Sequence, residues 1–229
     1  MPDTEFELLV ACCRAAFAQD GFNQNQAMPV NWDRFLRLAR RHRVEGFAWQ
    51  ALGEADLQAP PQVVHALAEQ ASRIARQNLT AAVECRRLLD AFEQWGTPLL
   101  FVKGLTLGAL AYRQPFLKMS CDIDGLVPPE AIEAAGKLLR GAGYRVHLPA
   151  SGDLETWHRR HKESVWLHET SGQQIDLHTR LSDNPRLISE LGVHSPQQVV
   201  QVAEGIRLPT LGIEELFAYL CVHGASSAW

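Results

Sequence analysis

Two closely spaced aspartates are the clearest candidates for chemistry in this sequence. Asp122 and Asp124 are one residue apart in the segment Ser120–Val127, which is expected to be a strand. Side chains alternate along a strand, so both carboxylates face the same side of it. Two carboxylates this close repel each other unless cations lie between them, and Mg²⁺ is a hard ion that prefers oxygen ligands. The pair alone is weak support for a metal site, because acidic residues with this spacing are common on solvated strands.

A third aspartate strengthens the metal hypothesis. Asp176 interrupts an otherwise apolar alternation in the strand-like run Gln174–His178. A carboxylate beside the first two would complete a two-metal site for phosphoryl-type displacement, in which the ions lie about 3.5–4 Å apart. His178 follows Asp176 by two residues, and we expect it to orient Asp176 or a nearby loop by a hydrogen bond; direct acid–base catalysis is the alternative.

Lys103 and Gly104 form a candidate phosphate site at a strand end, just before a helix. Exposed amides at a helix N-terminus favour phosphate, and glycine lets a phosphate approach the backbone closely. His158 and His161 lie in a polar stretch further along, and we interpret them mainly as surface residues.

The elements that must position these residues fall into two parts. In residues 1–96 the apolar pattern predicts a helix over Glu5–Phe17 and a second over Trp32–Arg43, for which Asn31 is the N-cap. A long helix is then expected from Pro61 until it stops at Gly96. From residue 97 the pattern predicts strands and helices in a mixed order. The expected strands are Leu99–Val102, Ser120–Val127, Tyr144–Val146, Glu163–His168, Gln174–Leu181 and, at an edge, Ile206–Pro209. The expected helices are Leu105–Tyr112, Pro129–Arg140, Pro185–Leu191 and Ile213–His223. We therefore predict an α+β fold: a helical N-terminal lobe (1–96) followed by a mixed sheet with flanking helices (97–229).

Composition excludes some classes of protein. The net charge of −4 argues against a general nucleic-acid binder, and no apolar stretch approaches the roughly 20 residues of a membrane span. The five cysteines are scattered, and the acidic N-terminus lacks a secretory pattern, so we expect a cytoplasmic protein.

Three segments together resemble a known superfamily. They read VKGLTLGALAY from Val102, KMSCDIDGLV from Lys118 and QIDLH from Gln174. This combination is similar to the DNA polymerase β-type nucleotidyltransferases. More narrowly, it resembles the bacterial uncharacterised nucleotidyltransferase family, whose glycine motif reads K-G rather than G-S. The resemblance covers roughly Leu99–Leu181 and implies the polymerase β-type sheet.

The resemblance implies a role for each motif. Asp122 and Asp124 would bind both Mg²⁺ (or Mn²⁺) ions and the triphosphate. Asp176 would bind the catalytic ion and help to deprotonate the attacking hydroxyl.

The phosphate-binding residues are also implied by the resemblance. Lys103 and Gly104 would hold the β- and γ-phosphates. Lys118, with Arg113 as the weaker alternative, would take the place of an arginine that often precedes the D-x-D strand. Lysine is a point charge without the bidentate fork of arginine.

The implied activity is transfer of a nucleoside monophosphate from an NTP, with ATP expected, to a hydroxyl of a small molecule or protein, with release of pyrophosphate.

A non-catalytic nucleotide- or partner-binding module of the same fold is the alternative. It is favoured by the lack of a clear arginine before Asp122, and by the end of the chain at Trp229, where family members continue with further helices. A truncated chain and a naturally short form would both explain that end. In a third reading, the three aspartates are solvated strand residues of an unrelated domain. Geometry separates these readings, since catalysis requires the three carboxylates to converge beside Gly104.

Overall fold

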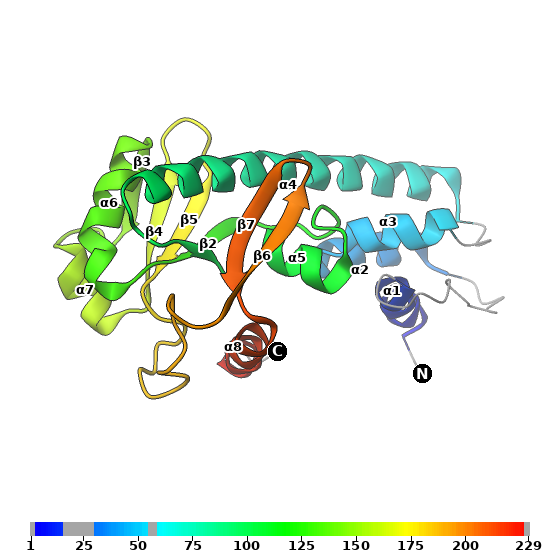
Figure 1. Ribbon diagram of the computed structural model, residues 1–229. Helices are drawn as coiled ribbons and strands as arrows, with labels where there is room; N and C mark the ends of the chain where they lie inside the picture. Colours follow the sequence, from blue (N-terminus) through cyan, green and yellow to red (C-terminus); the bar gives the residue numbers. More distant parts are fainter. Residues whose placement is uncertain (1–2, 16–29, 55–58, 227–229) are drawn as a thin grey trace. The chain divides into compact units, whose positions relative to one another are not determined.

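The computed structural model describes residues 3–15, 30–54 and 59–226, which form two compact units (Figure 1). The first unit comprises residues 1–80 and 108–120, and the second comprises residues 81–107 and 121–229. Among the described helices, none is long and apolar enough to cross a membrane.

The first unit is built from helices α1 (Thr4–Ala15), α2 (Trp32–His42), α3 (Glu45–Glu54) and the first part of α4 (Pro61–Gln94). Their apolar faces meet in one core that contains Leu8, Phe35, Ala48 and Leu67. Asn31 caps α2 as predicted, because its side chain accepts a hydrogen bond from the backbone N–H of Arg34 (3.0 Å). The predicted end of the first helix, residues 16–17, lies outside the described residues.

The second unit contains a five-stranded mixed sheet in the order β1-β2-β5-β4-β3. Its strands are β1 (Leu100–Phe101), β2 (Asp122–Leu126), β3 (Tyr144–Leu148), β4 (Glu163–His168) and β5 (Gln174–His178). β2 and β5 run parallel, whereas the other neighbours are antiparallel. The predicted α+β fold with a mixed sheet is confirmed.

One face of this sheet is apolar and buried. Ile123, Trp166, Ile175 and Leu177 lie on it, as period-2 alternation requires. Helix α6 (Ile132–Gly141) follows the short η1 turn (Pro129–Ala131) and packs closely here, since a Cβ on Gly136 would stand 3.4 Å from the Trp166 ring. The opposite face carries the aspartates and is therefore the face on which a site can form.

The remaining elements surround the sheet. The second part of α4, from Ala81, reaches β3, because the Tyr144 hydroxyl donates to Glu84 Oε1 (2.6 Å). Helix α5 (Leu105–Tyr112) follows β1, and α7 (Leu154–Arg160) precedes β4. Strands β6 (Gln197–Ala203) and β7 (Ile206–Leu211) form a separate hairpin, and β7 contacts both β1 and α8 (Ile213–Ser226) (Figure 1).

Several elements differ from the prediction. Helices α3 and α7 and strand β6 were not expected, and the helix predicted over Pro185–Leu191 is wrong. That segment forms turns instead: the backbone N–H of Arg186 bonds to Asn184 Oδ1 (3.0 Å), and Ile188 has a left-handed φ of 47°. A β-branched residue in that conformation interrupts a right-handed helix.

Candidate active site

The register of two parallel strands brings the predicted carboxylates together. Asp124 in β2 lies directly opposite Asp176 in β5, and Asp122 lies opposite Gln174. Residues opposite each other in a sheet point to the same face, and so do residues two apart in one strand. All three carboxylates therefore project from the same face of neighbouring strands.

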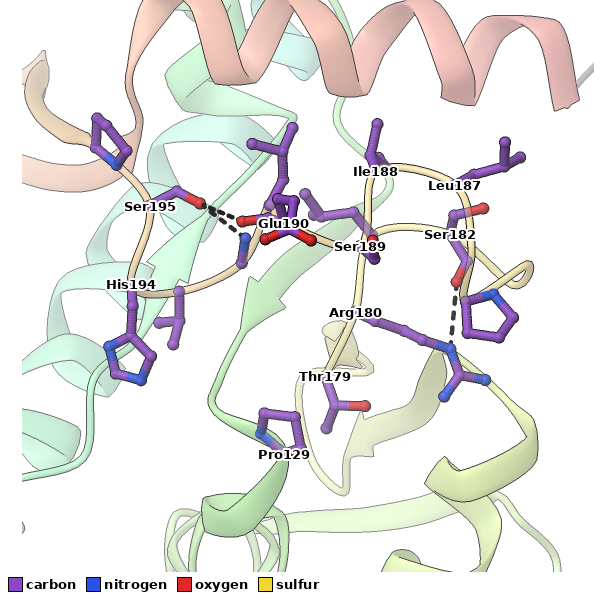
Figure 2. Close-up of a pocket in the computed structure, with 16 residues that line it drawn as sticks. Pro129, Thr179, Arg180, Ser182, Leu187, Ile188, Ser189, Glu190, His194 and Ser195 are labelled. Atoms are coloured by element: carbon purple, nitrogen blue, oxygen red, sulfur yellow. Dashed lines mark hydrogen bonds between the residues drawn. The ribbon is translucent and has the colours of Figure 1, made fainter.

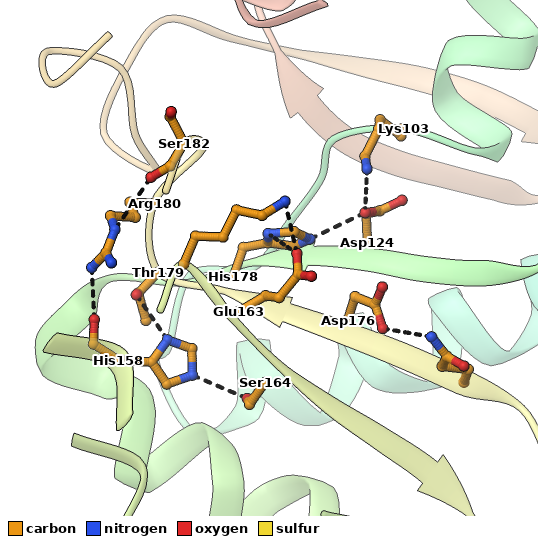
Figure 3. A network of polar contacts seen from close by, with 12 residues as sticks. Lys103, Asp124, His158, Glu163, Ser164, Asp176, His178, Thr179, Arg180 and Ser182 are labelled. Carbon is orange, nitrogen blue, oxygen red and sulfur yellow. Dashed lines mark hydrogen bonds and ion pairs between the residues drawn. The ribbon is translucent and has the colours of Figure 1, made fainter. Parts of the chain in front are cut away.

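Asp124 is the most buried of the three and is held by two partners. Lys103 Nζ lies 2.7 Å from Asp124 Oδ1, and His178 Nε2 lies 3.1 Å from the same oxygen (Figure 3). Burial alone would raise the pKa of Asp124, but the hydrogen bond from His178 and the charge of Lys103 outweigh it and lower that pKa to about 2. Burial in turn would lower the pKa of Lys103, but Asp124 more than offsets this, so that its pKa is raised. Lys103 and Asp124 are therefore a charged pair.

The polar contacts continue beyond His178. Its second ring nitrogen, Nδ1, lies 3.3 Å from Glu163 Oε2, and Lys162 Nζ lies 3.0 Å from that same oxygen. The Nδ1 contact is at ion-pair distance but lacks the alignment of a hydrogen bond. The imidazole thus lies between two carboxylates (Figure 3). The expected partner of His178 was Asp176 or a loop, whereas the carboxylates that it contacts are Asp124 and Glu163.

Asp122 and Asp176 behave in the opposite way to Asp124. Burial raises the pKa of both carboxyl groups, and the charges of the neighbouring aspartates raise them further. Gln174 Nε2 donates a hydrogen bond to Asp176 Oδ1 (2.8 Å), which only partly offsets this rise. Carboxylates that raise each other's pKa values are close enough to repel, and a bound cation would relieve that repulsion.

The three aspartates suit a hard divalent cation, because they offer oxygen ligands and the register of β2 and β5 places them on one face of the sheet. As the side chains lie, however, the described part of the chain holds no group of three or more His, Cys, Asp or Glu residues arranged around one ion. At Asp124, Lys103 and His178 both contact the same oxygen, Oδ1.

Lys103 and Gly104 lie between the end of β1 and the start of α5, as predicted. Gly104 has a left-handed φ of 59°, a conformation that glycine adopts without steric penalty. The buried Thr106 hydroxyl contacts the carbonyl oxygens of Phe101 (2.9 Å) and Lys103 (3.1 Å), which fixes the turn against the first residues of α5. This turn directs Lys103 to Asp124.

Lys118 belongs to the first compact unit. The buried Asn78 side chain fixes the backbone there, donating to the carbonyl oxygens of Pro115 (3.0 Å) and Lys118 (2.8 Å) and accepting from the N–H of Ser120 (3.1 Å). Arg113, the weaker alternative, lies in the same segment in a left-handed conformation. The role of either residue in phosphate binding stays a prediction.

Helix α8 contributes groups that the sequence did not single out. Lys103 and Asp124 affect the pKa values of both Tyr219 and His223, Glu163 also acts on Tyr219, and Lys162 on His223. Tyr219 and His223 are one helical turn apart, with ring centroids separated by 5.7 Å. Their spacing by four residues on one helix face was the available signal.

His158 has a structural position rather than the expected surface one. It is buried, with Nδ1 3.0 Å from Thr179 Oγ1 and Nε2 3.0 Å from Ser164 Oγ. Burial and the nearby charge of His178 lower its pKa to about 4. A neutral His158 therefore joins α7 to the ends of β4 and β5.

A cavity of about 530 Å³ opens directly after β5 (Figure 2). It is lined by Pro129 and by residues of the segment 179–196. Arg180 is fixed at its edge, because Nη1 donates to the carbonyl oxygen of His158 (2.6 Å) and Nε to that of Ser182 (3.2 Å). The volume is within the range of small-molecule pockets. None of the residues predicted for the site lines this cavity.

Comparison with known proteins bears on the family. No protein with a curated description matches the sequence. A crystal structure from Thermotoga maritima, described as a candidate nucleotidyltransferase, is similar over 62% of this chain and 84% of that chain, with 15% identity and a TM-score of 0.40. That likeness is too weak to bear on the site. The model of the family described as uncharacterised nucleotidyltransferase matches residues 28–229, so the chain belongs to this family.

Proposed function

We propose that this protein is a metal-dependent nucleotidyltransferase that moves a nucleoside monophosphate from an NTP to an acceptor hydroxyl. Membership of the family supports nucleotidyl transfer in general. The observation that supports the specific site is the register of β2 and β5, which sets Asp124 opposite Asp176 with Asp122 on the same face.

The three aspartates would hold Mg²⁺ or Mn²⁺. When bound, such ions stabilise the charge that develops on the attacking and leaving oxygens. Asp176 would have a second task, which is to accept the proton of the attacking hydroxyl. Gln174 engages its Oδ1, which leaves Oδ2 to take the proton of the acceptor hydroxyl.

The proposed reaction needs no reactant other than the NTP and the acceptor. The acceptor oxygen loses its proton to Asp176 and forms a bond to the α-phosphorus. The bond from that phosphorus to the bridging oxygen breaks, and pyrophosphate leaves with the electron pair. We expect ATP as the nucleotide.

Lys103 and Gly104 would bind the outer phosphates. Lys103 is bound to Asp124 in the nucleotide-free protein, so a metal ion at Asp124 would repel its ammonium group. A lysine that is only 20% exposed then needs another anion, and the triphosphate supplies it. In this proposal Lys103 exchanges a carboxylate partner for a phosphate partner when the nucleotide binds.

A non-catalytic module that binds nucleotide or a partner is the second candidate. It is favoured by the same contact, because the Lys103–Asp124 pair already neutralises one of the three carboxylates. A module that binds nucleotide predicts the same nucleotide binding as the enzyme but no pyrophosphate release, whereas a module that binds a partner predicts neither.

The test measures the melting temperature with each of ATP, GTP, CTP and UTP, with and without Mg²⁺, for the natural protein and Asp122→Asn. Saturation at about 100 times Kd should stabilise the protein by about 2.7 kcal/mol. Asp90→Asn is the control, since Asp90 is paired with Arg86 within α4. A Mg²⁺-dependent rise that Asp122→Asn loses and Asp90→Asn keeps supports the site. Pyrophosphate release from the same nucleotide then distinguishes the enzyme from a nucleotide-binding module. No rise with any nucleotide would contradict the enzyme and indicate a module that binds a partner.

A further inference from the structure

Tyr219 has an unsatisfied hydroxyl in the interior of the second unit. Its side chain is fully buried in α8, yet the hydroxyl makes no hydrogen bond to any residue that the structure describes. Buried polar groups in native proteins nearly always have a partner, so such an atom calls for an explanation. The neighbouring groups indicate what the partner would be.

Lys103 is the neighbour that matters most. Tyr219 and Lys103 each shift the pKa of the other, both through charge and through hydrogen bonding, so the two side chains are neighbours. Their alignment nevertheless falls short of a regular hydrogen bond. A lysine ammonium can only donate. Even a contact from Lys103 to the phenol oxygen would leave the phenol proton without an acceptor.

The hydroxyl keeps that proton under ordinary conditions. Burial raises the pKa of Tyr219 to about 12, which outweighs the opposite effect of Lys103. At neutral pH the side chain is therefore a neutral donor beside a cation. An anion with exposed oxygens can accept from both and balance the charge of the cation, and a phosphate fits that description.

We propose that the Tyr219 hydroxyl is a phosphate-binding group of the nucleotide site, donating to an oxygen of the triphosphate that Lys103 also contacts. This inference rests on the proposed function and extends the site from the sheet to α8. His223 lies one turn further along the same face, where Lys103, Lys162 and Asp124 act on it. Helix α8 thus supplies a wall of the phosphate site rather than only packing against β7.

Two tyrosine-to-phenylalanine substitutions separate this role from a structural one. Tyr219→Phe removes a hydroxyl that has no partner, so the ligand-free protein should keep its melting temperature or gain slightly. Tyr144→Phe is the matched control, because Tyr144 is equally buried but donates to Glu84 (2.6 Å). That variant should lower the melting temperature of the ligand-free protein and leave phosphate binding unchanged.

The binding probe is tripolyphosphate with Mg²⁺, which carries no base, followed by ATP with Mg²⁺. Calorimetry should show that Tyr219→Phe weakens tripolyphosphate binding by about 10- to 100-fold, the range for one hydrogen bond to a charged group. Unchanged binding in Tyr219→Phe would overturn the inference. A fall in the melting temperature of ligand-free Tyr219→Phe as large as that of Tyr144→Phe would also overturn it, because the hydroxyl would then have a partner within the protein.

These measurements distinguish a failure of the proposed function from a failure of the role of Tyr219. If the natural protein binds neither probe, the proposed function fails and the inference fails with it. If the natural protein binds both probes, loses them in Asp122→Asn and keeps them in Tyr219→Phe, only the role of Tyr219 is rejected.

Discussion

Lys103 and Asp124 form a charged pair with 2.7 Å between Nζ and Oδ1, on side chains that are only 20% and 6% exposed. The backbone sets up this pair, because the N–H of Val102 donates to the carbonyl oxygen of Asp124 (3.2 Å) and places the next residue beside it. The same pair neutralises a buried carboxylate that the proposed metal site would use. It therefore links the stability of the resting protein to the proposed chemistry.

Lys103→Met should destabilise the ligand-free protein. The substitution leaves Asp124 with His178 as its remaining partner, and breaking a buried pair from one side costs on the order of 3 kcal/mol. Urea unfolding at pH 7 measures the loss. Adding Asp124→Asn to the variant should restore most of it, because the uncompensated charge is gone. Arg159→Met is the exposed control, since Arg159 and Glu155 are 64% and 70% exposed, and its effect should stay within about 0.5 kcal/mol. A loss in Lys103→Met no larger than in Arg159→Met would show that the pair does not stabilise the fold.

Gly104→Ala should damage both stability and nucleotide binding. Gly104 has a φ of 59°, and an alanine in the left-handed region costs about 1–2 kcal/mol. The new methyl group would also stand where the proposed function has a phosphate approach the backbone. Gly172→Ala is the control: its φ is 69°, nothing lies within 4 Å of an added Cβ, and it belongs to the turn between β4 and β5. Both variants should lose similar stability in thermal unfolding, but only Gly104→Ala should lose affinity for tripolyphosphate. Equal affinities would mean that the turn does not bind phosphate.

His158 should make the protein less stable in mild acid. Its pKa is lowered from 6.5 to about 4 in the folded protein, so the unfolded chain takes up a proton first as the pH falls. The contribution of the neutral imidazole is complete above pH 6.5 and is lost between about pH 6.5 and 4. The loss is no more than about 3 kcal/mol, the free energy of a shift of this size.

His158→Gln provides the comparison, because glutamine does not titrate. Urea midpoints at pH 7 and pH 5 should differ more for the natural protein than for the variant. Equal pH sensitivity of the two proteins would show that His158 is not the group responsible.

The sequence predicted the carboxylate face because that inference needs only the two-residue period of a strand. Asp122, Asp124 and Asp176 each lie in a short segment whose apolar neighbours occupy the alternate positions. The contact between Lys103 and Asp124 could not be read in this way. It depends on the antiparallel register of β1 with β2, in which Phe101 lies opposite Gly125, and no local pattern sets that register.

The other differences have similar causes. His158 is buried, and Thr179 and Ser164 each contact one of its ring nitrogens. Thr179 is distant along the chain, and Ser164 lies on another element. Strand β6 has glutamine on both faces, with Gln198 on the side of the buried Val200 and Gln201 on the exposed side, so Gln197–Ala203 lacks a clean apolar alternation. Tyr219 lies in a segment that the sequence predicts to be an amphipathic helix, but the sequence cannot show that the buried hydroxyl of Tyr219 lacks a partner.

Removing a repelling carboxylate should stabilise the metal-free protein. Burial and the charge of Asp124 raise the pKa of Asp122, so the folded state holds this proton more tightly than the unfolded chain does. The corresponding stability is complete below the unfolded pKa and is lost as the pH rises through the folded pKa. At pH 7 in EDTA, Asp122→Asn should therefore raise the free energy of unfolding by about 0.5–2 kcal/mol. The gain should shrink as the pH is lowered toward 4. Asp153→Ala should have the opposite sign, because the Asp153 carboxylate caps α7 by accepting from the N–H of Thr156 (2.7 Å).

Adding Mg²⁺ and nucleotide should reverse the order of the two proteins. The natural protein gains binding free energy that Asp122→Asn cannot, so its melting temperature should rise above that of the variant. Such a crossing is expected of a residue that is retained for ligand binding at the expense of stability, and a solvated strand aspartate would produce neither the gain in EDTA nor the reversal. If Asp122→Asn is less stable than the natural protein in EDTA at pH 7, repulsion from Asp124 does not destabilise the charged form of Asp122. If the gain appears but Mg²⁺ and nucleotide leave the order unchanged, the cluster is strained without being a metal site.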